Sequence, residues 1–396
     1  MAGALDGIRV LDLSRHLAGP YCAMMLGDLG AEVIKVERPG VGDESRHWGP
    51  PFFGGESAYY LCCNRNKRSL TLNLKHARGL AIARALAERS DVVIENFRVG
   101  VLDKLGLGYA DLRAVNPRLI YCSISGFGHT GPDRDLGSYD FLLQGRSGLM
   151  SITGEPDGPP MKVGVAIADL AAGLFANNAV LSALFVRERT GIGQHVDIAL
   201  FDSQIALLAN VASNYLCSGA VPERWGNAHA SIVPYQIFQA ADDYLILAVG
   251  NDEQWRQFCE AAGVSAWAQD PRFATNPERV ANRETLVPLV QELLRGKTVA
   301  EWLQLCANAD VPAGPVNTID KVFADPQTLA RGMLLQMPHP TLGTVRLAGT
   351  PLNLSATPAQ MRLPPPLLGE HTDVILRTVI GLDAPAIAAL HRDGVA

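Results

Sequence analysis

The sequence lacks the cysteine and histidine spacings on which disulfide frameworks and zinc sites depend. Its seven cysteines, at positions 22, 62, 63, 122, 217, 259 and 306, are odd in number, scattered, and without a C-x-x-C pair. This distribution predicts reduced thiols in the protein core. The nine histidines are also dispersed, with no H-E-x-x-H motif, so we expect no metal site.

Other absences exclude further classes of protein. There is no Walker loop, no G-x-S-x-G elbow and no internal repeat. The net charge is −6 and only 19% of the residues are charged, so we expect no nucleic-acid partner, and an anionic ligand needs a local basic patch. The N-terminus shows neither a secretory nor an organellar leader pattern, which predicts a cytoplasmic protein that binds no membrane.

The length of 396 residues exceeds the usual single core and predicts two lobes. Residues 1–200 alternate β-branched runs with helical stretches, which favours an α/β domain with a parallel sheet. Residues 201–225 are typical of a linker, and residues 226–325 predict a smaller α+β domain. Expected strands cover residues 8–14, 31–37, 91–97, 118–125, 194–200, 233–238 and 244–250; expected helices cover 20–29, 76–89, 109–115, 169–187, 286–294 and 384–391.

Residues 165–186 form an apolar run as long as a membrane span. Asp169, Asn177 and Asn178 lie inside it. One Asp near the centre of a bilayer costs roughly 2.5–3.5 kcal/mol even on the lenient insertion scale, and no second run of this kind exists. We therefore interpret the run as a buried helix.

Two patterns suggest a nucleotide ligand. Residues 126–131, G-F-G-H-T-G, match a dinucleotide fingerprint, but P-D-R-D-L-G-S follows them instead of a helix, so we do not expect NAD. No acidic residue lies between Glu56 and Glu88, where the basic residues are Arg65, Lys67, Arg68, Lys75, Arg78 and Arg84. This basic stretch is suited to phosphates, and a solvated basic face is the alternative interpretation.

Asp169 stands among apolar and small residues. It either begins a helix, where the dipole stabilises a carboxylate, or serves as a nucleophile that the same geometry keeps ionised. The neighbours Ala168, Ala171, Ala172 and Gly173 let a ligand or another chain approach closely. Tyr139-Asp140 and the run 250–255, G-N-D-E-Q-W, have a structural alternative too, as a buried Tyr and a helix cap at Asn251 or Asp252.

Taken together, the motifs resemble the family III CoA-transferases (CaiB/BaiF type), the group that contains formyl-CoA:oxalate and carnitine CoA-transferases. The similar segments are V-L-D-L-S-x-x-x-A-G-P (10–20), G-A-E-V-I-K-V-E (30–37), G-D-E-S-R-x-W (42–48), N-R-N-K-R-S-L-T-L-N-L-K (64–75), E-N-F-R-x-G (95–100), S-G-F-G-x-T-G-P (125–132), Y-D (139–140), A-D-L-A-A-G (168–173), G-N-D-E-Q-W (250–255) and G-E-H-T-D-V-I-L (369–376). Residues 224–236 and Y-Y-L-C-C-N-R-N-K-R are most similar to the succinyl-CoA:glutarate, or dicarboxylate, branch.

The resemblance implies a role for each matching position. Asp169 would be the nucleophile that forms a mixed anhydride and then an aspartyl-CoA thioester. The positions that would bind CoA, a substrate rather than a resident cofactor, are Arg38, Leu72, Asn73, Lys75, Asn96, Phe97, Arg98 and Lys104. The active-site neighbours would be Leu17, Trp48, Tyr139, Asp140, Gly250 and Asn251. The far carboxylate of a dicarboxylate needs a cation, for which Arg15, His16 and Arg46 are candidates.

The resemblance also implies a fold and its alternatives. It predicts a Rossmann-like large domain completed by residues 345–396, a return linker at 326–344, a ring-shaped monomer, and an interlocked homodimer. Formyl-CoA transferases have Gln in place of Leu17 and a glycine run in place of G-N-D-E, so we do not expect oxalate as the acceptor. The related racemases have His in place of Tyr139, which disfavours the alternative of an acyl-CoA racemase or isomerase. A CoA-binding subunit without chemistry is the remaining alternative.

Overall fold

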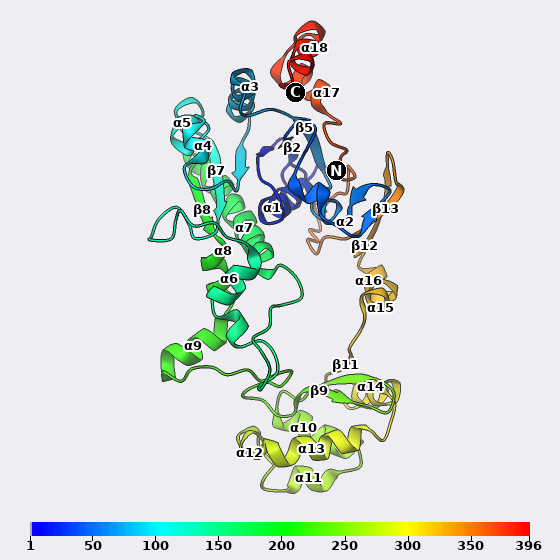
Figure 1. Ribbon diagram of the computed structural model, residues 1–396. Helices are drawn as coiled ribbons and strands as arrows, with labels where there is room; N and C mark the ends of the chain where they lie inside the picture. Colours follow the sequence, from blue (N-terminus) through cyan, green and yellow to red (C-terminus); the bar gives the residue numbers. More distant parts are fainter. Residues whose placement is uncertain (1) are drawn as a thin grey trace. The chain divides into compact units, whose positions relative to one another are not determined.

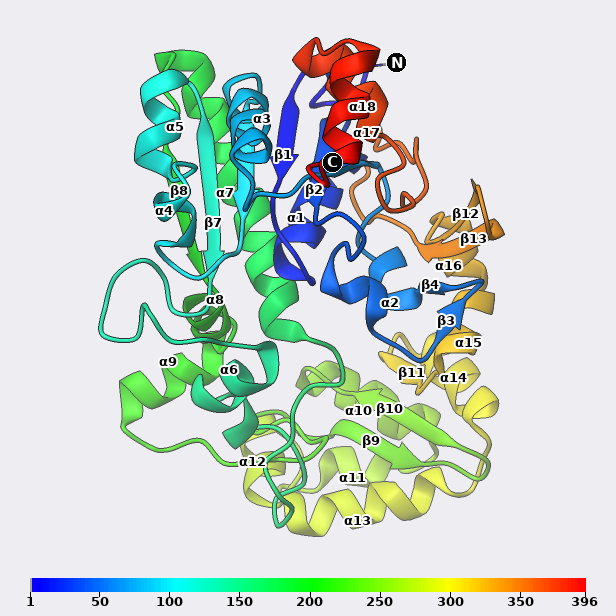
Figure 2. The same cartoon turned by 45° about the horizontal axis from the view of Figure 1, so that its top comes forward.

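The computed structural model describes residues 2–396, which form two compact units (Figures 1 and 2). The larger unit comprises the chain up to Leu149, Val163–Leu216 and Pro326–Ala396. The smaller unit comprises Met150–Lys162 and Cys217–Asp325. The chain therefore leaves the larger unit twice and returns to it twice.

A six-stranded parallel sheet forms the centre of the larger unit. Its strands are β1 (Arg9–Asp12), β2 (Glu32–Glu37), β5 (Lys67–Thr71), β6 (Val92–Glu95), β7 (Ile120–Ser125) and β8 (His195–Ala199). Their order is β5-β2-β1-β6-β7-β8, with parallel pairing throughout. This is the order of doubly wound dinucleotide-binding folds, in which the chain reverses its direction of travel between β1 and β6. The expected parallel α/β sheet is thus confirmed.

Helices cover both faces of this sheet (Figure 2). One buried core lies against α1 (Ala18–Asp28) and α7 (Ile167–Thr190), and a second lies against α3 (Ala77–Glu88), α5 (Tyr109–Val115) and α18 (Ala384–Arg392). The small residues of α7 serve this packing: a Cβ on Gly173 would lie 2.8 Å from the backbone oxygen of Ala18. The neighbour that approaches Asp169's helix closely is therefore α1.

The remaining elements of the larger unit connect these layers or flank them. They are η1 (Glu44–His47), β3 (Phe52–Phe53), β4 (Glu56–Ser57), α2 (Ala58–Leu61), α4 (Val101–Lys104), α6 (Asp140–Arg146), α8 (Leu200–Ala206), α9 (Ala209–Ser218), α16 (Pro326–Ala330), β12 (Leu334–His339), β13 (Gly343–Ala348), α17 (Thr372–Ile375) and η3 (Leu376–Ile380), and η2 (Leu149–Ser151) begins where this unit first ends. The C-terminal segment packs on the second core, because Ile375, Leu376, Ile387 and Leu390 are buried in it.

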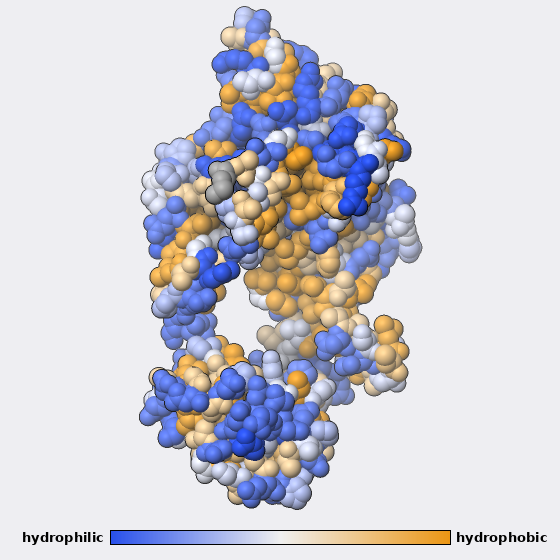
Figure 3. Space-filling view, turned by 180° about the vertical axis from the view of Figure 1, so that it is seen from behind, coloured by the Kyte–Doolittle hydropathy of each residue, from blue (hydrophilic) through white to orange (hydrophobic). Residues whose placement is uncertain are grey.

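Helix α7 is long and apolar enough to cross a membrane by length and composition. Its buried face packs in the first core, as the sequence interpretation expected. Its opposite face exposes Leu174, Phe175, Phe185 and Val186. Figure 3 shows apolar side chains gathered on one face of the larger unit.

The smaller unit has a three-stranded antiparallel sheet, β11-β10-β9. Its elements are β9 (Tyr235–Gln239), β10 (Tyr244–Ala248), α10 (Asp252–Ala261), α11 (Ser265–Gln269), α12 (Asn276–Ala281), α13 (Arg283–Leu294), α14 (Val299–Asn308), β11 (Ala313–Pro315) and α15 (Ile319–Ala324). Trp255, Phe258 and Trp302 lie in its core. Fully buried Arg279 donates to Val233 O at 2.7 Å and pairs with Asp252 at 2.8 Å, which ties the start of α10 to the sheet.

Candidate active site

Two cavities lie where β1 and β6 end, at the reversal of the strand order. Ligands of open α/β sheets bind at this position, outside the carboxyl ends of the strands. One cavity, about 430 Å³, is lined by Asp169 with Arg134 and the segments 96–99 and 136–139, and we call it the Asp169 cavity. The other, about 520 Å³, is lined by Lys75 with the segments 13–15 and 35–38, and we call it the Lys75 cavity. Phe97 lines both.

Asp169 is in the first turn of α7, where the sequence places it. The N-terminus of this helix is capped from another element, because Asp140 of α6 accepts the backbone N–H of Ala168 at 2.8 Å. Burial and the charge of Asp140 raise the pKa of Asp169 to about 7. Burial and the neighbouring charge thus outweigh the helix start, which we expected to keep this carboxylate ionised.

Aromatic rings form one side of the Asp169 cavity. His16 stacks on Trp48 with centroids 5.0 Å apart and planes at 9°, and Trp48 meets Tyr59 edge-on at 4.9 Å. We call His16, Trp48 and Tyr59 the aromatic wall. Burial and the charge of Asp169 raise the pKa of Tyr59, so its hydroxyl stays protonated beside the carboxylate. Tyr139 also lines the cavity, with 71% of its surface exposed.

The Lys75 cavity gathers cations that the rest of the protein does not neutralise. Arg38, Lys75 and Lys104 line it together with Leu72 and Asn73. The three cations are exposed, and none of them has an ion-pair partner within residues 2–396. The acids in its lining have partners of their own: Glu37 pairs with Arg46, Asp43 with Lys35 and Glu44 with Arg15. The three cations and the apolar part of the lining are therefore suited to a phosphorylated ligand with an apolar portion.

A three-residue contact separates the two cavities. The side chain of Asn96 accepts Arg15 N–H at 2.9 Å and donates to Arg15 O at 2.8 Å. The guanidinium of Arg15 lies 4.4 Å from the ring centroid of Phe97. Of the predicted CoA-binding residues, Asn96, Phe97 and Arg98 line the Asp169 cavity, and the others line the Lys75 cavity. The structure thus brings all eight to these two adjoining spaces.

Most of the basic stretch has a structural role, which corrects its interpretation as a phosphate-binding patch. Lys67 is fully buried and pairs with Asp12 at 2.9 Å, and Arg65 pairs with Asp28 at 2.6 Å. The other pairs are Arg68–Glu32, Arg78–Asp393 and Arg84–Glu88. Of the six basic residues, only Lys75 lines either cavity. Except for Glu88, the acids that pair with these basic residues are distant in sequence. The sequence of the basic stretch alone therefore could not predict the ion pairs.

Arg46 is not available to a substrate carboxylate. It is 9% exposed and lines neither cavity. Its guanidinium donates to Glu37 at 2.7 and 2.8 Å and to the Tyr60 hydroxyl at 2.6 Å. We therefore withdraw it as a candidate.

The other two candidates for the substrate carboxylate, Arg15 and His16, line different cavities. Arg15 lines only the Lys75 cavity and pairs with Glu44 at 3.1 Å, whereas His16 lines the Asp169 cavity. Burial lowers the pKa of His16, so it offers a neutral ring near neutral pH. The arginines that line the Asp169 cavity are Arg98 and Arg134. Arg134, in the loop before Tyr139, was missed from sequence because no secondary-structure pattern marks it.

Four predicted neighbours of the site, among them Asp140, which accepts the N–H of Ala168 at the start of α7, are not in the cavity lining. Leu17 is buried behind it, packed with Met24 and Cys63. Gly250 and Asn251 belong to the smaller unit. There, Asn251 accepts Gln254 N–H at 2.9 Å and caps α10, as its structural alternative expected, and the N–H of Gly250 donates to the Gln254 side chain at 2.8 Å.

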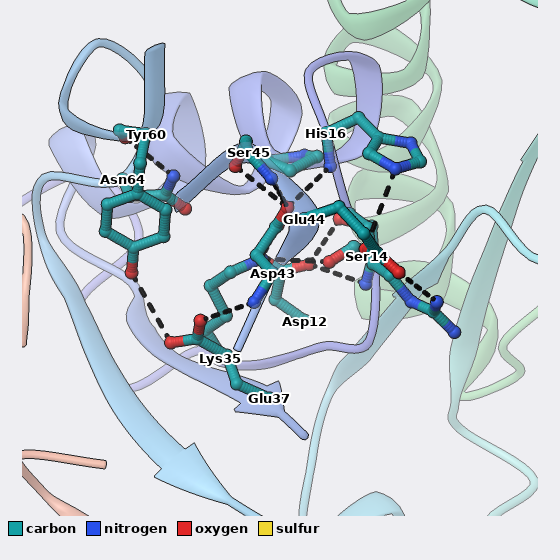
Figure 4. A network of polar contacts seen from close by, with 12 residues as sticks. Asp12, Ser14, His16, Lys35, Glu37, Asp43, Glu44, Ser45, Tyr60 and Asn64 are labelled. Atoms are coloured by element: carbon teal, nitrogen blue, oxygen red, sulfur yellow. Dashed lines mark hydrogen bonds and ion pairs between the residues drawn. The ribbon is translucent and has the colours of Figure 1, made fainter. Parts of the chain in front are cut away.

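A network of buried charges lies beneath the wall (Figure 4). Lys35, fully buried, pairs with Asp43 at 2.9 Å and donates to Ser14 O at 2.9 Å. Burial acts to lower the pKa of Lys35, but the charges of Asp43 and Asp12 outweigh it and raise that pKa. Lys35 is therefore charged and fully engaged. Among residues 2–396 there is no group of three or more His, Cys, Asp or Glu side chains that could hold a metal ion.

A doubly wound sheet, a cavity with a carboxylate and an adjoining cavity with exposed cations are typical of an enzyme that acts on a phosphorylated ligand. Residues 5–372 match the family model of CoA-transferase family III. The chain belongs to this family, and it is a CoA-transferase.

Curated relatives and solved structures agree with the assignment. The chain is 46% identical over 391 residues to succinyl-CoA:glutarate CoA-transferase of Mus musculus, covering 99% of this chain and 90% of that protein. It is 48% identical over 378 residues to succinate–glutarate CoA-transferase of Agrobacterium fabrum, covering 94% of each chain. A crystal structure of a CAIB/BAIF family protein from Brucella suis superposes with a TM-score of 0.86 at 47% identity, over 96% of this chain and all of that one.

Proposed function

We propose that this CoA-transferase moves CoA from succinyl-CoA, or another dicarboxyl-CoA, to a dicarboxylic acid such as glutarate. The observation that carries the proposal is the pair of adjoining cavities: one holds a lone, partly buried Asp169, and the other holds three unpaired cations. The names of the relatives at 46% and 48% identity support the substrate class.

The proposal places the nucleotide part of CoA in the Lys75 cavity. Arg38, Lys75 and Lys104 supply charge-assisted hydrogen bonds to its phosphates. The pantetheine arm then passes the Arg15–Asn96–Phe97 contact toward Asp169. In this arrangement Phe97, which lines both cavities, gives the apolar arm a surface to pack on.

The proposed chemistry runs through two covalent forms of Asp169. Its carboxylate attacks the thioester carbonyl, and the C–S bond breaks to give a mixed anhydride and the CoA thiolate. The thiolate attacks the Asp169 carbonyl, which releases the donor acid and leaves an aspartyl-CoA thioester. The acceptor carboxylate repeats these two steps in reverse, and CoA leaves on the acceptor while Asp169 is regenerated.

The residues around Asp169 have distinct proposed tasks. Asp140 holds the first turn of α7 through Ala168 N–H, and it raises the pKa of Asp169, which makes the carboxylate more basic. Tyr59, Trp48 and His16 exclude water from one side of the acyl group. Arg98 and Arg134 are the proposed partners for the far carboxylate of the substrate, because they are the arginines that line this cavity.

The oligomeric state and the cellular location of the protein are also proposals. We propose a homodimer, and the support is the exposed apolar side of α7, with Leu174, Phe175, Phe185 and Val186. The interlocked arrangement rests on the sequence resemblance, the domain boundaries on the sequence patterns, and a cytoplasmic location on the N-terminal sequence.

The test offers succinyl-CoA with a panel of acids of increasing length, with one or two carboxyl groups, and detects new thioesters by mass spectrometry. The proposal expects glutaryl-CoA to form and butyryl-CoA to form much more slowly. In Arg134→Ala and Arg98→Ala the preference for the dicarboxylate should shrink by about tenfold, the value of one charge-assisted hydrogen bond. Equal use of glutarate and butyrate by the unaltered protein would refute the dicarboxylate assignment.

A further inference from the structure

Asp43 bonds directly to the backbone of His16 and reaches Trp48 through Ser45 of η1. One carboxylate oxygen, Oδ1, accepts the backbone N–H of His16 at 3.2 Å. The same oxygen accepts the N–H and hydroxyl of Ser45 at 2.9 and 2.8 Å and so caps η1. Figure 4 shows Asp43 with His16 and Ser45 around it. At the other end of η1, Trp48 donates its N–H to Ser45 O at 3.2 Å.

The backbone of His16 requires such an anchor. Its φ is +66°, in the left-handed region, which costs a non-glycine residue roughly 1–2 kcal/mol. The N–H of His16 bonds to Asp43, and the carbonyl of Ser14 accepts from Lys35 at 2.9 Å. Lys35 and Asp43 pair with each other at 2.9 Å. The buried Lys35–Asp43 ion pair thus bonds to the backbone on both sides of Arg15, at Ser14 O and His16 N–H. These bonds stabilise the strained conformation of His16.

The two rings belong to segments that are far apart in sequence, and contacts with the start of η1 join them: Asp43 accepts the N–H of His16, and Glu44 pairs with Arg15 at 3.1 Å and lies 3.6 Å from the His16 ring. His16 follows β1, Trp48 follows η1, and the segments are more than thirty residues apart in sequence. The rings stack nearly parallel at 5.0 Å, and both backbones are bonded, directly or through Ser45, to a common point. Asp43 is that point, and it is 2% exposed.

We propose that Asp43, held by Lys35, is a positioning residue that fixes the His16–Trp48 stack and thereby the shape of the Asp169 cavity where the acceptor acid enters. Asp43 acts through the two rings and takes no part in the covalent steps. The inference rests on the proposed function for its kinetic readout, and on ring geometry for a readout that needs no turnover.

The experiment is a double-mutant cycle between Asp43→Asn and His16→Gly. Asn keeps an acceptor oxygen but loses the ion pair with Lys35, and glycine tolerates the positive φ without strain. Alone, Asp43→Asn should lower kcat/KM for glutarate by about tenfold or more, whereas in the His16→Gly background its effect should fall to about threefold or less. If the fold-changes in kcat/KM of the two single variants simply multiply in the double variant, the two residues act independently and the proposal is overturned.

The matched control is Asp28→Asn. Asp28 is equally buried at 1% exposure and pairs with Arg65 at 2.6 Å, but it lines neither cavity, whereas Asp43 lines the Lys75 cavity. The Kd for CoA is therefore measured in both variants, and it should stay unchanged in Asp43→Asn. Asp28→Asn should lose stability as Asp43→Asn does, but keep the kcat/KM for glutarate. An equal loss of kcat/KM in both variants would show a general effect of buried-charge removal and contradict a positioning role.

A second readout separates this inference from the proposed function. The emission of Trp48, taken as the difference between each protein and its Trp48→Phe counterpart, should change in Asp43→Asn and stay unchanged in Asp28→Asn. This difference in Trp48 emission is expected even if the unaltered protein transfers no CoA to glutarate. That outcome would refute the proposed function but not the positioning role of Asp43. If Asp43→Asn does not fold, Ser45→Ala, which removes one bond to Asp43 Oδ1, should change Trp48 emission in the same direction. No change in the folded variant refutes the inference.

Discussion

Asp140 accepts the backbone N–H of Ala168 at 2.8 Å and thereby holds its own charge next to Asp169. The two carboxyl groups come from different helices, α6 and α7. One caps the helix that carries the other. This contact couples the placement of the proposed nucleophile to its basicity.

Removal of the Asp140 charge should shift the pH dependence of acylation. Burial and then Asp140 raise the pKa of Asp169 to about 7, so the reactive carboxylate forms as the pH rises through 7. Asp140→Asn keeps an acceptor for Ala168 N–H and should move this rising limb lower by about 0.5–1 pH unit. Single-turnover acylation by succinyl-CoA between pH 5 and 9 measures it. Glu292→Gln, at a side chain of the smaller unit that is 78% exposed and lines neither cavity, is the control. A rising limb that moves equally in both variants contradicts this explanation.

Asp169→Asn should stabilise the protein, and only above acidic pH. The folded pKa of about 7 lies above the ordinary value of 3.8, so between these values the folded state holds a proton that the unfolded state has released. The free energy of unfolding therefore falls as the pH rises through this window. Asparagine does not titrate and so removes this loss of stability. We expect the free energy of unfolding of Asp169→Asn to exceed that of the unaltered protein by on the order of 2 kcal/mol at pH 7.5, and the difference to vanish near pH 4. Urea unfolding at both pH values checks it, and a gain independent of pH would disagree.

Neutralising the cations of the Lys75 cavity should weaken CoA binding. Lys75→Ala and Lys104→Ala should each raise the Kd for CoA about tenfold at low salt, with a smaller difference at 0.5 M salt, because each removes a charge-assisted contact to phosphate. Titration calorimetry measures the affinity. Arg84→Ala is the matched control, because Arg84 belongs to the same basic stretch but faces Glu88 at 3.7 Å. An unchanged Kd in both lysine variants would place the nucleotide elsewhere.

Arg46→Met should affect folding rather than substrate binding. The substitution leaves the buried carboxylate of Glu37 without its bidentate partner, and breaking such a pair costs about 3–5 kcal/mol. We expect a lower urea midpoint with an unchanged KM for glutarate in the folded fraction. A normal midpoint with a raised KM would restore Arg46 as a substrate ligand.

The sequence predicted the elements whose patterns are local. The β-branched runs and the apolar helix match β1, β2, β6, β7, β8 and α7 within a few residues. Strand β5 was missed because K-R-S-L-T reads as a charged segment, and its Lys67 is neutralised by Asp12, 55 residues away. The position of Asp169 in the first turn of α7 was also predicted.

The contacts of the site depended on distant segments and could not be predicted. The charge that tunes Asp169 comes from Asp140, on another helix. The aromatic wall joins residues 16, 48 and 59, whose approach follows from the packing of β1, η1 and α2. The resemblance named Trp48 as a neighbour, whereas Tyr59, quoted within a motif, had no assigned task. The bonds from Asp43 to His16 and Ser45 also join segments that are distant in sequence, so no local pattern marks them.

The most direct test of the account is a search for covalent CoA on Asp169. The protein is mixed with succinyl-CoA without an acceptor, treated with hydroxylamine, digested and examined by mass spectrometry. We expect a hydroxamate on the peptide that contains Asp169, no modification in Asp169→Asn, and retained CoA binding by that variant. A modification on another residue, or full CoA transfer by Asp169→Asn, would contradict the central claim.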